Sequence, residues 1–107
     1  MITPDQKKED KTTLIVTSTP DPEGLSFLNE YVTRVMPMLL NAGGVVVKRT
    51  EVTRVFHGDR QFTYLLVMDF PSDESLNNLF ESEAYQQLIK IREKGFVNMN
   101  ILYGRDL

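Results

Sequence analysis

The stretch from residue 61 to residue 70 constrains the fold more than any other part of this sequence. Apolar side chains alternate onto both of its faces: Phe62, Tyr64, Leu66 and Met68 on one, Leu65 and Val67 on the other. A strand that is apolar on both faces is usually covered on both sides. We therefore expect it to pack against helices on one face and against a further partner on the other.

The rest of the chain predicts three more strands and two helices. Alternation and β-branched residues predict strands over 12–17, 45–56 and 96–103, with a turn at 58–60 before the strand over 61–70. Apolar spacings of three and four predict one helix over 22–41, with Asp21 as its cap and a kink at Pro37. A second helix, in two pieces, follows Ser72 and ends at Gly95.

The order of these elements is strand–helix–strand, repeated once. Two such units predict the α+β ferredoxin-like βαββαβ fold, a four-stranded antiparallel sheet with both helices on one face. The helices leave the other face open, although the strand over 61–70 is apolar there as well. A second copy of the chain, packed through that open face, is the partner that we expect.

Composition limits the classes of function. The chain has 107 residues, which predicts one domain over 12–107 behind a flexible tail over 1–11. It has no cysteine, which excludes disulfides, thiolate metal sites and thiol nucleophiles. Its net charge of −3 disfavours nucleic acid and anionic membranes as partners. We find no pattern of a signal peptide and expect a cytoplasmic protein without a cofactor.

Three residues are candidates for catalysis. His57 is the single histidine and could act as a general acid or base, with Asp59 as its orienting partner. Both could equally be solvated turn residues beside Gly58. Arg49 has the sequence parity of Val45 and Val47, so it could reach a cleft beneath the helices and hold a carboxylate or enolate oxygen. Its alternative role is an ion pair, with Glu51 or with an acid of a second copy.

Four further residues are candidates for ligand binding. Arg92 shares the apolar stripe of the second helix with Tyr85, and a buried arginine needs a partner. That partner could be a ligand anion, or Asp69, Asp73 or a helix-end carbonyl. Tyr31, Tyr64 and Tyr85 could offer phenolic hydrogen bonds, or simply fill the core. One histidine and scattered carboxylates predict no metal site.

Several short motifs resemble a known family. They are Asp21-Pro22, Ala42-Gly43-Gly44 followed by Arg49, Gly58-Asp59, Phe70-Pro71-Ser72, Tyr85-Gln86 and Arg92. Over residues 12–103 the chain resembles the domain-of-unknown-function family numbered 1330, in the dimeric α/β-barrel superfamily. His57 stands where that family often has an acidic residue.

The resemblance implies a homodimer with a ligand pocket between the sheet and the helices of each subunit. Superfamily relatives include cofactor-independent monooxygenases, decarboxylases, isomerases, haem-degrading enzymes and stress-response proteins. The leading hypothesis is a small-molecule-binding homodimer, such as a cofactor-independent isomerase, decyclase or monooxygenase. The alternative is a dimeric binding or stress-response module that carries out no chemistry. A haem-degrading role would need His57 or a tyrosine as an iron ligand.

Overall fold

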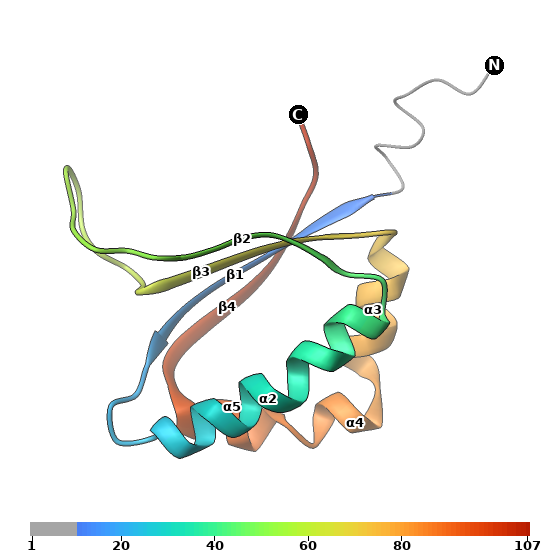
Figure 1. Ribbon diagram of the computed structural model, residues 1–107, viewed down its shortest axis with the longest axis horizontal. Coiled ribbons are helices and arrows are strands. Elements are labelled where there is room, and N and C mark those ends of the chain that lie inside the picture. Colours follow the sequence, from blue (N-terminus) through green and yellow to red (C-terminus); the bar gives the residue numbers. More distant parts are fainter. Residues whose placement is uncertain (1–10) are drawn as a thin grey trace.

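The computed structural model describes residues 11–107, which form a four-stranded sheet with a layer of helices on one face (Figure 1). In chain order the elements are β1 (Thr12–Pro20), α2 (Leu25–Asn41), β2 (Val45–Glu51), β3 (Tyr64–Phe70), α3 (Asp73–Glu81), α4 (Glu83–Gln86), α5 (Ile89–Gly95) and β4 (Phe96–Gly104). The tail expected over 1–11 lies, apart from Lys11, outside the described residues.

The sheet has the strand order β2-β3-β1-β4, and each neighbouring pair is antiparallel. The central strands β1 and β3 pair from Thr12 opposite Phe70 to Ser18 opposite Tyr64. Their central position explains why these two strands are the most buried of the four, since each has a neighbour on both sides and helices over one face. The α+β ferredoxin-like fold predicted from the order of elements is confirmed.

Two predicted strands are shorter in the structure. The strand expected to reach Phe56 ends at Glu51, and the strand expected from Gln61 begins at Tyr64. Residues 52–63, which we call the β2–β3 arm, project beyond one end of the sheet (Figure 1). The amide of Val52 donates to the carbonyl of Thr63 at 2.8 Å, and strand pairing stops there. Alternation continues along the arm, but within residues 11–107 no strand pairs with it beyond that bond.

The first helix also begins later than predicted. Asp21 does not cap it: the Asp21 carboxylate accepts from the amide of Glu23 at 2.9 Å, and its carbonyl accepts from the amide of Gly24 at 2.9 Å. These bonds close a turn before the helix, so α2 starts at Leu25 rather than at Pro22. At the other end Gly43 has φ +96°, as expected for a glycine that terminates a helix.

A register shift in β2 changes which of its residues face the helices. The shift lies between Val46 and Lys48, and it places Val45 opposite Asp69 but Arg49 opposite Leu66. Leu66 faces the helices, whereas Asp69 lies on the open face of the sheet. The prediction that Val45 and Arg49 share a face is therefore wrong, because one extra residue, a β-bulge, interrupts the alternation.

The core lies between the sheet and the helices. Its largest fully buried side chains are Phe70, Leu14, Met68, Leu76 and Leu88. The serine hydroxyls of Ser72 and Ser82 accept from the amides of Ser75 and Tyr85, each at 3.2 Å, and so cap α3 and α4.

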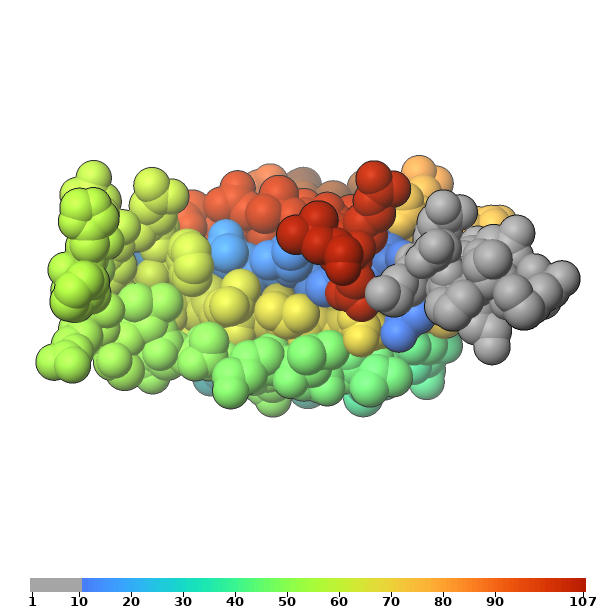
Figure 2. Space-filling model, turned by 90° about the horizontal axis from the view of Figure 1, so that it is seen from above, coloured from blue at the N-terminus to red at the C-terminus, as the bar shows by residue number. Residues whose placement is uncertain are grey.

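The opposite face of the sheet carries no helix among the described residues. Figure 2 looks onto this face, where β4, β1, β3 and β2 lie side by side in that order. The strand registers place five apolar side chains on it: Ile15, Val45, Leu65, Val67 and Leu102. This apolar patch is the surface that sequence analysis assigned to a second copy.

Candidate functional site

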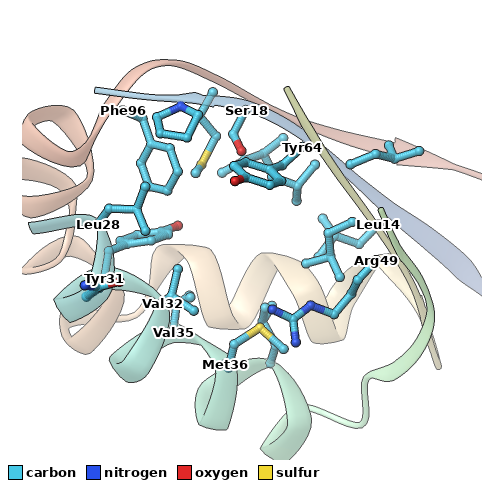
Figure 3. Close-up of a pocket in the computed structure, with 18 of the residues that line it drawn as sticks. Leu14, Ser18, Leu28, Tyr31, Val32, Val35, Met36, Arg49, Tyr64 and Phe96 are labelled. Atoms are coloured by element: carbon cyan, nitrogen blue, oxygen red, sulfur yellow. The ribbon is translucent and has the colours of Figure 1, made fainter. Parts of the chain in front are cut away.

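A cavity of about 690 Å³ lies between the helix-facing side of the sheet and α2 (Figure 3). Most of the lining is apolar, and it comes from β1, β3, β4 and α2: Leu14, Val16, Leu28, Val32, Val35, Met36, Leu39, Leu66, Phe96, Met99 and Ile101. The polar residues of the lining are Ser18, Asn29, Tyr31, Arg49, Thr50, Glu51 and Tyr64. An apolar chamber with a few polar groups is typical of sites for small organic molecules.

Arg49 provides the cationic group of this cavity. It lies on the edge strand β2 and extends toward Met36 of α2, as Figure 3 shows. Within residues 11–107 the one ion pair joins Arg34 to Glu30 at 3.1 Å, so Arg49 has no carboxylate partner there. The described chain therefore does not contain the alternative ion pair between Arg49 and Glu51. The guanidinium has free donors for an anionic or carbonyl oxygen.

The exposed residues of the lining mark the rim of the cavity. Arg49, Thr50 and Glu51 are exposed on β2, and Tyr64 of β3 has 41% of its surface exposed. Tyr31, by contrast, is only 5% exposed and lies inside. A molecule in the cavity would therefore meet charged groups at the rim and a phenol inside.

Tyr31 belongs to a chain of hydrogen bonds that leads away from the cavity. Its hydroxyl lies 2.9 Å from the hydroxyl of Tyr85, and Nη1 of Arg92 donates to the Tyr85 hydroxyl at 2.8 Å. Burial, and secondarily the neighbouring Tyr85, raises the pKa of Tyr31 well above its ordinary value of 10.0. The phenol is therefore neutral and able to donate at any physiological pH.

The partner of Arg92 differs from those that sequence analysis proposed. Asp69 and Asp73 form no ion pair with it within residues 11–107, and its bond goes to a phenol instead. Tyr85 and Arg92 do not line the cavity, so any influence they have on a ligand must pass through Tyr31.

The structure does not bring His57 and Asp59 to the cavity. Both are exposed on the β2–β3 arm, and neither is among the cavity's lining residues. Of the seven residues singled out in the sequence, three line the cavity: Tyr31, Arg49 and Tyr64. Within the described residues, no three histidines or carboxylates come together as a set of metal ligands.

Sequence analysis missed four polar residues of the cavity lining: Ser18, Asn29, Thr50 and Glu51. Ser18 has the same parity on β1 as Leu14 and Val16, which line the cavity too, so strand alternation could have identified it. Glu51 lies two residues after Arg49 and shares its face. The position of Glu51 at the cavity could have been inferred only once the face occupied by Arg49 was known.

The sequence of the chain matches a known family over nearly the whole described part. The profile of the family described as "Domain of unknown function (DUF1330)" aligns with residues 13–104. The chain belongs to the DUF1330 family. A search of curated proteins found no match to this DUF1330 chain.

Solved structures agree with the fold. A protein of unknown function from Rhodopseudomonas palustris has a TM-score of 0.81 at 16% identity, covering 92% of this chain and 84% of that one. A dimeric protein of unknown function with a ferredoxin-like fold from Bacteroides fragilis has a TM-score of 0.58 at 11% identity, covering 90% and 96%. The hydroxynitrile lyase from Passiflora edulis has a TM-score of 0.65 at 15% identity, covering 92% and 95%. At such identities the likeness establishes the fold of this DUF1330 chain and leaves its chemistry open.

No helix in residues 11–107 has both the length and the apolar character needed to cross a membrane.

Proposed function

We propose that two copies of this chain form a homodimer in which each subunit binds a small organic molecule with an apolar body and an acidic or enolic oxygen. The observation that carries the proposal is Arg49, a guanidinium without a carboxylate partner in the described chain, beside a cavity of about 690 Å³ with apolar walls. The walls would bury the body of the ligand, and the guanidinium would bind its oxygen.

Substitution of Arg49 tests this proposal. Straight-chain carboxylates from pentanoate to decanoate are titrated by calorimetry into the wild-type protein and into the Arg49→Met variant. A charge-assisted hydrogen bond contributes about 1.5–3 kcal/mol, so we expect the variant to bind about 10- to 150-fold more weakly. Arg54→Met is the matched control, because Arg54 is exposed on the β2–β3 arm and does not line the cavity. Equal losses in both variants would mean that Arg49 acts only through net charge.

The homodimer is proposed through the open face of the sheet. The apolar patch there supports it, as does the dimeric state of the Bacteroides fragilis structure with this fold. Val67 lies on a central strand, so Val67→Asp should halve the mass measured by sedimentation velocity. Leu40→Asp is the control, since Leu40 is 52% exposed on the helical layer. A wild-type protein that sediments as a monomer at micromolar concentration would contradict the dimer.

Isomerisation is the reaction that the polar groups of the cavity suit best. Arg49 and Glu51 lie two residues apart and face the same side of β2. Arg49 would stabilise an enolate oxygen, while Glu51 would accept a proton from the adjacent carbon and return it to another. Keto acids in D₂O, followed by proton NMR, test this step. Exchange with the wild type but not with Glu51→Gln would support it, and no exchange would favour a module that binds without chemistry.

A further inference from the structure

The hydrogen bonds between Arg92, Tyr85 and Tyr31 have a defined direction. Arg92 can only donate, so its 2.8 Å bond makes the Tyr85 hydroxyl oxygen an acceptor. In the 2.9 Å bond between the two phenols, geometry alone allows either one to be the donor. Whichever phenol accepts that bond keeps a hydroxyl hydrogen that must find another acceptor.

Burial decides between the two directions. Tyr85 is 2% exposed and does not line the cavity, so a free hydroxyl hydrogen on it would be buried without an acceptor. Leaving a buried donor unsatisfied costs about 1–3 kcal/mol. Tyr31 lines the cavity, and Figure 3 shows its oxygen directed into that space. The favoured direction is therefore from Arg92 to Tyr85, from Tyr85 to Tyr31, and from Tyr31 into the cavity.

We propose that Tyr31 is a fixed hydrogen-bond donor for a second, uncharged oxygen of the ligand, with Tyr85 and Arg92 as its positioning residues. This deepens the proposed function and rests on it. Figure 3 places Tyr31 and Arg49 on opposite sides of the cavity, with the apolar walls between them. The ligand class is thus a compound with an acidic head for Arg49, an apolar spacer and a carbonyl at its far end.

The charge of Arg92, which acts through Tyr85, strengthens the hydrogen bond that Tyr31 donates. The guanidinium withdraws electron density from the Tyr85 oxygen and so polarises the Tyr85 hydroxyl, which strengthens the hydrogen bond that this hydroxyl donates to Tyr31. Hydrogen bonds in such a chain reinforce one another. Within residues 11–107 Arg92 has no carboxylate that would offset this effect. Tyr31 also remains protonated, since burial raises its pKa.

Two ligand series, each titrated into the wild type and into Tyr85→Phe, isolate the contribution of the Tyr31 hydrogen bond to affinity. One series is the straight-chain carboxylates, and the other is keto acids of the same lengths that carry a methyl ketone at the far end. In the wild type the best keto acid should bind about 3- to 10-fold more tightly than its carboxylate, the effect of one neutral hydrogen bond. In Tyr85→Phe that advantage should disappear, while the affinity for the plain carboxylate stays the same.

A spectroscopic signal separates positioning from a merely structural role. With a ¹³C label at the ketone, the carbonyl resonance should move to higher chemical shift on binding to the wild type and move less on binding to Tyr85→Phe. Tyr103→Phe is the matched control, because the Tyr103 hydroxyl bonds Asn77 at 2.7 Å in an exposed position. Should Tyr85→Phe fail to fold, Arg92→Met weakens the same chain and should reduce the same keto advantage.

The outcomes are distinct for the two proposals. If carboxylates bind through Arg49 but the ketone adds no affinity, the role of Tyr31 is refuted and the proposed function stands. If the ketone advantage survives in both Tyr85→Phe and Arg92→Met, the positioning role of Tyr85 and Arg92 is refuted and the proposed function again stands. If neither series binds the wild type, both proposals are refuted.

Discussion

Gly95 lies where the end of α5 crosses the first turn of α2, and its replacement by alanine tests this crossing directly. A Cβ atom at residue 95 would lie 2.7 Å from the amide nitrogen of Leu28 and 2.8 Å from its Cα. It would also lie 3.1 Å from the carbonyl carbon of Phe27. All three neighbours are main-chain atoms of a helix, so no change of rotamer can relieve the contacts. The two helices would have to separate.

Two effects on stability oppose each other in Gly95→Ala. Alanine is favoured over glycine inside a helix by about 0.8–1 kcal/mol, but Gly95 is the last residue of α5 and gains only part of this. Forcing an extra carbon into a well-packed contact costs about 1–3 kcal/mol. The steric cost is larger, so we expect a net loss of about 1–2 kcal/mol. For a domain of this size the melting temperature should fall by about 5–15 °C.

Thermal unfolding followed by circular dichroism measures this loss. Glu93→Ala is the control, because Glu93 is exposed on the same helix and its replacement should change stability by less than about 0.5 kcal/mol. Arg92 lies on α5, so the separation of α2 from α5 should also disturb the hydrogen bonds from Arg92 through Tyr85 to Tyr31 and reduce the preference for ketones. A melting temperature for Gly95→Ala within about 2 °C of the wild type would show that the crossing is looser than these distances imply.

Three further outcomes are expected. Burial raises the pKa of Tyr31 above 10.0, so the folded state holds the phenol proton more tightly than the unfolded state does. The free energy of unfolding should therefore fall as pH rises above about 10, and it should fall less steeply in Tyr31→Phe. Equal slopes of melting temperature against pH in the two proteins would contradict this. Ser72→Ala removes the cap of α3 and should cost about 0.5–2 kcal/mol in urea unfolding, whereas Ser26→Ala, at an exposed position, should cost little. His57→Gln should leave carboxylate affinity unchanged in calorimetry, since His57 lies on the β2–β3 arm; a marked loss would place the arm at the ligand.

Most of the fold could be predicted because it depends on local patterns. The alternation along β1 and β3 and the glycines after α2 are features that a single segment carries. The start of α2 was predicted three residues too early, because the residues Asp21-Pro22 that suit a helix cap suit a turn as well. Nothing in a run of three valines reveals a bulge, so the face occupied by Val45 could not be predicted.

The site was harder to predict because its contacts join distant parts of the chain. Tyr31 and Tyr85 are 54 residues apart in the sequence, and their bond depends on how α2 and α4 are packed. A partner for Arg92 was expected, but charge alone suggested a carboxylate where the fold supplies a phenol. His57 has a side chain suited to acid–base catalysis, but the sequence does not show where that side chain lies, and in the structure the β2–β3 arm holds it outside the cavity.

The bulge in β2 also divides that strand into two independently anchored parts. Before it, the chain is fixed by Gly44, where an added Cβ would lie 2.6 Å from the ring of Phe70. After it, pairing with Leu66 fixes Arg49. Loss of Val47 would leave Val46 and Lys48 opposite consecutive residues of β3 and restore a regular ladder. Chain length can therefore change at this point in evolution while the cation of the cavity keeps its place.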